Sequence, residues 1–468
     1  MLDTIEGNRS SRGASQALVR MVGPATAVFV GVGVAIGSGI FKAPGEIANC
    51  AGSPWAIMLV WLFAGLITLL QSLVTAELAT RFPKAGSDYQ FLKEAYGEFA
   101  AFFFGWSYTI FIIGGGAATI AAALGGFAAD LCNLKETWAQ PVFAVGAIVM
   151  VTVINAAGLK AGAITQNVLT VLKVAAVLGI AVGAFVLAGR ATPAEYQPTQ
   201  GAGGLHGVRL FLIALLPAFW SYAGATDTAK LAEEIKDVRR SLPRALVGGT
   251  LLLTGVYCVF NYALLAALPP AEMAGRESVP AAVFQRLSGF GIAEVILLVS
   301  VLVCFGALSS TILSTVRVTF ALARDGLAFR SLGRMSSNQA PVWSLIVICC
   351  IASAFASNQS FFEMLEIYFV ASAILYGMSY MSLIVFRLRD RRAGRAFPDT
   401  AYRAPLGVLM ALLLVLIQLA LCANILYSVF SDWRNEKHHS LWTLAILAAI
   451  GLFYRVWKRF GARSASGL

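Results

Sequence analysis

The feature of this sequence that most constrains its fold is a series of long apolar runs. Residues 55–74 carry no charged side chain, and residues 168–188 carry a single lysine. Because backbone groups exposed to lipid must be hydrogen-bonded internally, such runs cross the ~30 Å hydrocarbon core as helices of roughly 20 residues. Charged residues make up 13% of the chain, about half the ~25% of a soluble domain. The sequence therefore predicts an all-α integral membrane protein and excludes an ordinary soluble enzyme.

Charge clusters and Pro/Gly turns divide the chain into twelve predicted transmembrane helices. The third and eighth are longer than a bilayer requires, so we expect them to tilt or to extend into water. The predicted spans are residues 21–48, 54–80, 95–129, 139–157, 162–189, 208–232, 243–268, 291–324, 341–357, 361–386, 405–430 and 440–458. Residues 1–20 and 459–468 are expected to form terminal tails outside the membrane.

The basic residues are distributed unequally between the two sides of the predicted bundle. Most of the 35 lysines and arginines fall in alternate loops and in the two tails, with dense clusters at 230–244 and 387–403. Positive charge is retained on the cytoplasmic side, so we expect a multi-pass protein of the cell membrane with both termini cytoplasmic. The same bias accounts for the net charge of +11, and no nucleic-acid partner is expected.

Cysteine and histidine positions do not indicate a metal or cofactor site. The seven cysteines lack a CxxC spacing, and the three histidines fall in predicted outer loops. A structural or catalytic metal needs several such ligands close together, and isolated cysteines in apolar runs behave as small hydrophobic residues. We therefore expect no metal, no cofactor and no enzymatic activity. An accessory subunit is not expected either.

Two predicted spans contain small and polar residues where an unbroken helix would be apolar. In the first span Gly37 and Gly39 flank Ser38, and in the sixth the run 219–228 is interrupted by glycine and hydroxyl residues. These interruptions lie five spans apart, as expected for two inverted five-helix repeats with a broken first helix in each. The repeats would be residues 21–189 and 208–386, followed by two further helices at 405–458. The alternative is that the glycines only permit close helix packing.

A helix broken inside the membrane offers two kinds of binding group. The amides at the start of one half attract an anion, and the carbonyls at the end of the other attract a cation. Two adjacent breaks therefore suit a zwitterion such as an α-amino acid. Trp220 and Tyr222 would close over such a ligand, or would simply be packing aromatics. Gly115, within a triple glycine, would leave room for a bulky side chain.

Several short segments in order along the chain resemble the amino acid–polyamine–organocation (APC) superfamily, and within it bacterial permeases similar to the L-type amino acid transporters. They include Ile36–Phe41 (IGSGIF), Ala76–Ala79 (AELA), Phe219–Gly224 (FWSYAG), Glu233–Lys236 (EEIK) and Ala321–Gly326 (ALARDG). The resemblance covers about the first 335 residues and implies the leucine-transporter fold with alternating access. It further implies amides from Ser38, Gly39 and Ile40 for the carboxylate, and carbonyls from Ile36, Phe219, Tyr222 and Ala223 for the amino group.

Lys173 is a charged residue inside the fifth predicted span, without an acidic residue within one turn. Such a charge is costly in a membrane and is by default functional. In permeases of the resembling kind a lysine here occupies the place of a bound sodium ion, near the break in the first span and Ser309 or Ser310. It would tie these helices together or exchange a proton during transport, or else extend to the membrane interface. Its presence argues against sodium coupling.

Two further charged residues leave the side-chain preference of the site open. Lys42 would pair with Glu46 one turn on, or would line the outer vestibule and disfavour cationic substrates. Asp227, with Thr226, would cap the second half of the sixth span, or would face the pocket and favour an amine-bearing side chain. These two alternatives point in opposite directions.

The sequence as a whole predicts a secondary transporter for α-amino acids or close derivatives, working by exchange or by coupling to protons. The alternative on the same fold is an uptake carrier for polyamines or other organic amines, for which Asp227 would face the pocket and a carboxylate would be dispensable. A sensor would need an appended soluble domain, and a channel would need a lined pore in place of one occluded site.

Overall fold

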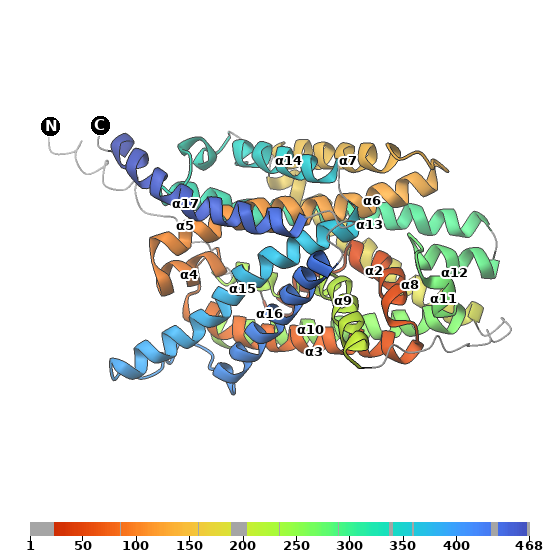
Figure 1. Ribbon diagram of the computed structural model, residues 1–468, viewed down its shortest axis with the longest axis horizontal. Helices are drawn as coiled ribbons and strands as arrows, with labels where there is room; N and C mark the ends of the chain where they lie inside the picture. The colour runs from red at the N-terminus through yellow and green to blue at the C-terminus, as the bar shows by residue number, and fades with distance from the viewer. Residues whose placement is uncertain are drawn as a thin grey trace.

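The computed structural model describes residues 23–84, 86–157, 159–188, 204–233, 235–288, 290–336, 340–357, 360–431 and 439–465, and its regular elements are helices (Figure 1). Most of the long helices run roughly along the longest axis of the molecule. The long uninterrupted ones are α3 (Pro54–Arg81), α7 (Ala139–Ala156), α8 (Leu159–Ala188), α10 (Val238–Ala267), α13 (Phe290–Arg324), α14 (Val342–Ala356), α15 (Phe361–Arg392), α16 (Gly407–Ser431) and α17 (His439–Ala465).

The length and apolarity of these helices agree with the prediction of an all-α membrane protein. Within the described residues, eight helical segments are long and apolar enough to cross a bilayer, and three shorter ones are apolar: Val171–Val186, His206–Tyr222 and Val342–Ala356. Each of the predicted spans overlaps one or more of the observed helices.

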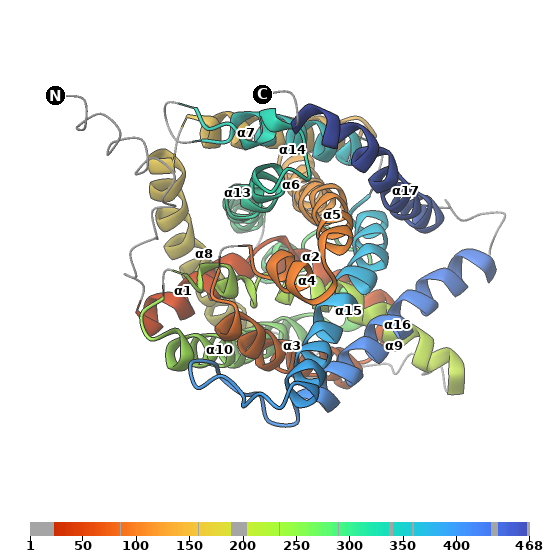
Figure 2. The same cartoon turned by 90° about the vertical axis from the view of Figure 1, so that its left-hand side faces the viewer.

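Large apolar side chains cover the outer faces of several helices, where a soluble protein would be polar. On α3, Leu59 and Leu66 are half exposed, and on α16 Leu416 is 60% exposed. In Figure 2, which views the bundle end-on, α7, α8, α10 and α17 lie at its periphery, and α2 lies in its interior. An apolar patch this extensive needs a covering of lipid to be stable.

The first predicted span is interrupted at the predicted glycines. Helix α1 (Pro24–Ala35) ends before Ile36, whose backbone is extended, and α2 (Ser38–Ala51) begins after Gly37. No side chain caps the start of α2, so its first-turn amides have no helical acceptor. The break therefore presents amide donors in the middle of the molecule.

The sixth predicted span is interrupted as well. Helix α9 (Gly204–Tyr222) ends in a turn and is followed by the short 3-10 helix η4 (Asp227–Leu231). Gly224 in this turn has a φ of 97°, a conformation that residues with a side chain rarely adopt. This positive φ allows the chain to leave the helix and start again within a few residues.

The third predicted span is one long helix with an unusual centre. It begins as α5 (Glu98–Ser107), widens into the π-helix η3 (Tyr108–Gly115) and continues as α6 (Gly116–Leu131). Wide turns of this kind are rare and often mark functional sites. The prediction of a single continuous span did not anticipate the widening, although the triple glycine 114–116 lies at its end.

Short helices lie near the ends of the long ones. Helix α4 (Asp88–Tyr96) follows α3, whereas α11 (Pro270–Met273) and α12 (Val279–Ser288) follow α10. In Figure 1, α4 lies toward the left-hand end of the long axis and α11 and α12 toward the right-hand end. The short 3-10 helix η5 (Arg330–Gly333) follows α13.

Candidate functional site

The two helix breaks lie against each other at the centre of the bundle. An added Cβ at Gly39 would stand 2.6 Å from Cα of Ser221, so only glycine allows α2 to pack this closely on α9. From α10, the buried Tyr257 hydroxyl donates to the carbonyl oxygens of Ser221 (2.8 Å) and Ala35 (3.2 Å). One tyrosine therefore binds the last turns of both α1 and α9, a role that the sequence did not suggest.

A cavity adjoins these breaks, and most of the predicted binding residues line it. Of the residues predicted for the site, the lining includes Ser38, Gly39, Phe219, Trp220, Tyr222, Ala223 and Asp227. Ile36 and Ile40 are not among the lining residues, and their side chains are buried in the surrounding core. The prediction for these two concerned backbone groups and stays a prediction.

Trp220 closes over the start of α2. Its indole Nε1 donates to the Ser38 hydroxyl at 3.1 Å, and its ring meets that of Tyr368 edge-on at a centroid distance of 5.1 Å. The hydroxyl of Tyr222 instead donates to the carbonyl of Trp61 on α3, at 3.1 Å. Trp220 and Tyr368 thus pack together beside the start of α2, and the predicted cover by Trp220 and Tyr222 stays a prediction.

Within the triple glycine 114–116, the residue that lines the cavity is Gly116, one residue beyond the predicted Gly115. A Cβ at Gly116 would contact Trp220 and Tyr368 at 3.7 and 3.8 Å, whereas one at Gly115 would meet no atom within 4 Å. Because the π-helix shifts the face that each residue presents, sequence position alone does not identify the inward-facing glycine.

Three of the described residues that line the cavity are charged: Asp88, Asp227 and Lys230. The Asp227 carboxylate pairs with the Lys230 ammonium at 2.8 Å, and Asp88 accepts a hydrogen bond from Ser379 at 2.5 Å. No side-chain bond caps η4, so the capping role predicted for Asp227 with Thr226 is wrong. In the sequence, Lys230 lies near the end of the sixth predicted span and is counted with the basic cluster 230–244, but in the structure it lines the cavity.

Lys173 is fully buried on α8. Its ammonium donates to the carbonyl oxygen of Gly33 on α1 at 3.4 Å, which ties α8 to the half-helix before the first break. Ser309 exchanges hydrogen bonds with Asn155 of α7, and the predicted approach of Lys173 to Ser309 or Ser310 stays a prediction. The contact with α1 is the geometry expected of a tether.

One turn after Ser38 on α2, Lys42 forms the predicted pair with Glu46 and a shorter one that was not predicted. Its ammonium lies 3.7 Å from Glu46 and 2.5 Å from Glu277, in the segment between α11 and α12. The same segment packs closely on α2 and α6. A Cβ added to Gly45 on α2 would stand 2.6 Å from the carbonyl oxygen of Arg276. A Cβ added to Gly126 on α6 would stand 2.7 Å from the carboxylate of Glu277.

The cavity extends from the breaks toward the opposite end of the bundle. It follows α3 through Gln71 and Thr75, and α15 through Tyr376 and Tyr380, to Asp88 on α4. These residues lead toward the basic ends of α3 and α15, whereas the Lys42–Glu277 pair lies near α11 and α12. The cavity therefore leads toward the basic ends of α3 and α15, and the Lys42–Glu277 pair is not part of its lining.

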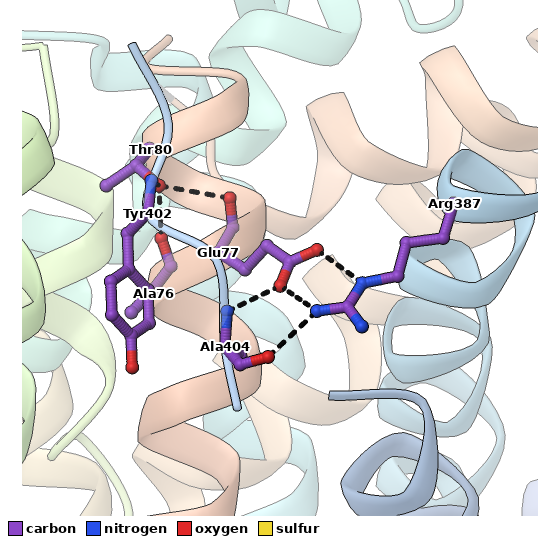
Figure 3. Close-up of polar contacts among 6 residues, drawn as sticks. All are labelled: Ala76, Glu77, Thr80, Arg387, Tyr402 and Ala404. Carbon is purple, nitrogen blue, oxygen red and sulfur yellow. Dashed lines mark hydrogen bonds and ion pairs between the residues drawn. The ribbon is translucent and has the colours of Figure 1, made fainter. Parts of the chain in front are cut away.

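The basic end is held together by a buried carboxylate, that of Glu77 on α3 (Figure 3). It accepts two hydrogen bonds from the Arg387 guanidinium, at 2.9 and 2.6 Å, and one from the backbone amide of Ala404 at 2.7 Å. One turn on, Thr80 accepts from the amide of Tyr402. The segment Ala76–Ala79, noticed for its resemblance, thus connects α3, α15 and the loop that leads to α16.

This combination of features defines a class of protein: a helical membrane protein whose central cavity lies between two interrupted helices. Residues 22–453 match the family model described as amino acid permease, and the chain belongs to this family. A permease moves a solute across a membrane without changing its covalent bonds, so the protein is a multi-pass membrane transporter and not an enzyme.

Individual relatives match over most of their length. The chain is 29% identical to the serine/threonine exchanger SteT of Bacillus subtilis, covering 82% of this chain and 87% of the relative. It is 28% identical to the branched-chain amino acid permease BcaP of Lactococcus lactis, covering 80% and 83%. It is 25% identical to the b(0,+)-type amino acid transporter 1 of mouse, covering 85% and 82%.

Proposed function

We propose that the protein transports α-amino acids across the cell membrane by alternating access, with the substrate bound between the two helix breaks. The observation that carries the proposal is the cavity beside the uncapped start of α2 and the end of α9. The amides of Ser38, Gly39 and Ile40 would bind the carboxylate. The carbonyls of Ile36, Phe219, Tyr222 and Ala223 would bind the ammonium group.

The architecture that we propose has twelve transmembrane helices, with α1 to α8 and α9 to α15 as inverted repeats and α16 and α17 added. Both termini would be cytoplasmic, because the basic ends of α3 and α15 belong on that side. The cavity would then lead to the cytoplasm, and Lys42 and Glu277 would close the outer side. Support comes from the two breaks, which fall at corresponding positions of the two halves.

The relatives support an amino acid substrate and leave the mode of coupling open. One is named as an exchanger and another as a permease for branched-chain amino acids. We propose exchange or proton-coupled uptake, with Lys173 as a tether between α8 and α1 in place of a bound sodium ion. An amine carrier is less well supported, because the Asp227 carboxylate in the cavity already has Lys230 as its partner.

Ligand-induced stabilisation of the purified protein tests the proposed binding chemistry. A ligand that binds only the folded state raises Tm by mass action. We expect leucine, or another α-amino acid, to raise Tm in detergent. The matched amine without a carboxylate, 3-methylbutylamine, and the matched acid without an amine, 4-methylpentanoate, should leave Tm unchanged. An equal shift with the amine would contradict the roles of Ser38 and Gly39.

The proposed closure of the outer side by Lys42 and Glu277 can be tested separately, by removing the charge of Lys42. Replacing Lys42 by methionine removes the ion pair with Glu277, and we expect the outer side to open more often. A partly exposed pair contributes on the order of 1 kcal/mol, so the population should change by a few-fold. The measurement is labelling of Ala307→Cys, in the cavity and in a background without native cysteines, by an impermeant thiol reagent added outside.

The control for this measurement is Lys84→Met, because Lys84 is 65% exposed and lies 3.9 Å from its partner Glu94. Labelling should be unchanged in that variant. The exchanged pair Lys42→Glu with Glu277→Lys should restore low labelling. Equal labelling of wild type and Lys42→Met would show that the pair does not hold the outer side closed.

A further inference from the structure

The charged residues of the cavity lie outside the two helix breaks, on η4 and α4. These elements contribute no group to the proposed site for the carboxylate and the amino group of the substrate. Asp227 and Lys230 are three residues apart on η4, and Asp88 lies in the first turn of α4. All three line the same cavity as Ser38 and Trp220. The side chain of a substrate held at the breaks would therefore lie near these charged groups.

Lys230 is the one cation among the described lining residues, and its position is fixed by two neighbours. Its ammonium lies 2.8 Å from Oδ1 of Asp227, and their side chains are 15% and 21% exposed. It also lies 5.8 Å from the ring centroid of Tyr108 in the π-helix, within the range of a cation–π contact. The ammonium thus neutralises the nearby carboxylate inside the cavity.

Asp88 does not replace Asp227 as a free negative charge. Burial raises the pKa of Asp88, with the Ser379 hydrogen bond and the Lys230 charge as smaller opposing influences. A raised pKa favours the neutral carboxylic acid. Asp227 is paired with Lys230, and Asp88 is hydrogen-bonded to the Ser379 hydroxyl, so neither carboxyl group is an isolated negative charge in the cavity.

We propose that the Asp227–Lys230 pair sets the charge preference of the cavity, and that Lys230 restricts transport to α-amino acids with uncharged side chains. This inference rests on the proposed amino acid transport. A cationic side chain would meet the Lys230 ammonium and would find its only strong countercharge occupied. Specificity by repulsion of the wrong ligand is a common device in binding sites.

The direct test replaces Lys230 by methionine, which keeps the length of the side chain and removes its charge. Asp227 is then left unpaired in the cavity, and we expect it to accept a cationic side chain. In counterflow with proteoliposomes, wild type should accumulate leucine and exclude lysine. Lys230→Met should raise the lysine-to-leucine ratio by about tenfold or more, the effect of one close charge pair.

Two further variants separate charge from shape. Lys230→Arg keeps the pair and should exclude lysine as wild type does. The double variant Asp227→Asn with Lys230→Met has neither charge, so its lysine-to-leucine ratio should fall back toward the wild-type value. Leucine transport by Lys230→Met without any gain for lysine would overturn the inference. Lys84→Met serves as a control for removal of a lysine outside the cavity.

A measurement on wild type covers the case in which Lys230→Met does not fold. Excess unlabelled isoleucine should abolish leucine counterflow, whereas the same excess of lysine should leave it intact. Strong inhibition by lysine would overturn the charge preference but leave amino acid transport standing. If wild type moves no α-amino acid at all, the proposed function itself fails, so the two failures are distinct.

Discussion

Replacing Gly39 by alanine is expected to abolish most transport. The new Cβ would lie 2.6 Å from Cα of Ser221 and 2.9 Å from its Cβ. Because the obstacle includes backbone, α2 would have to move away from α9, and the two breaks would separate. Overpacking of this kind costs about 1–3 kcal/mol. If that energy is lost from the binding site, transport falls by roughly ten- to a hundredfold.

The measurement for Gly39→Ala is the initial rate of counterflow, normalised to the amount of protein in the vesicles. Gly248→Ala on α10 is the matched control, since a Cβ there would meet no atom within 4 Å. It should transport at the wild-type rate, because alanine is a better helix former than glycine. A fully active Gly39→Ala would show that close packing of α2 on α9 is not needed for transport.

Replacing Glu77 by glutamine is expected to be the most destabilising single change that we predict. The carboxylate is 1% exposed and is the partner of Arg387, which is itself 19% exposed. Removing one member of a buried pair costs about 3–5 kcal/mol, because the other charge is left without compensation. Glutamine also provides only one carbonyl oxygen where Glu77 provides two acceptors for Arg387 and Ala404.

Thermal unfolding in detergent measures this effect as a fall in Tm. The control is Glu94→Gln, because Glu94 is 46% exposed and its lysine partner is 3.9 Å away. An exposed pair of this kind contributes about 0–1 kcal/mol, so Tm should barely change. Similar Tm values for Glu77→Gln and wild type would show that the Glu77–Arg387 pair (Figure 3) is not an important structural connection between α3 and α15.

The helical fold and the position of the breaks were predictable from local chemistry. Glycine and serine are costly in the middle of an apolar helix, so Gly37 and Ser38 indicated an interruption without any knowledge of the partners. The second break was similarly marked by the run after Phe219. Helix lengths were predictable for the same reason, because each span must cross the bilayer by itself, and eight of the described helical segments are long and apolar enough to do so.

What the sequence did not reveal are contacts between distant segments. Tyr257 is 222 residues from Ala35, and Glu277 is far from Lys42 in the chain. A tyrosine or a glutamate looks the same in sequence whether it faces lipid, water or a partner helix. Lys230 was the exception with a usable signal, because it follows Asp227 by three residues, a spacing that places two side chains on one face of a helix.

In the structure, each of the two charged residues that left the side-chain preference open has a close partner of opposite charge. Lys42 is neutralised by Glu277 and Glu46, and Asp227 is neutralised by Lys230. Neither is an isolated charge, and the side-chain charge preference of the site stays a prediction. The sequence left it open because a charge and its countercharge can be assigned only when both are located in space.

Counterflow in proteoliposomes tests the central claim most directly. Vesicles loaded with unlabelled leucine, serine or 3-methylbutylamine would be diluted into the same compound in labelled form, with protein-free vesicles as the blank. The account predicts accumulation of one or more α-amino acids and none of the amine, because the amides at the start of α2 require a carboxylate. Accumulation of the amine alone would contradict the zwitterion site and would favour a carrier for organic amines.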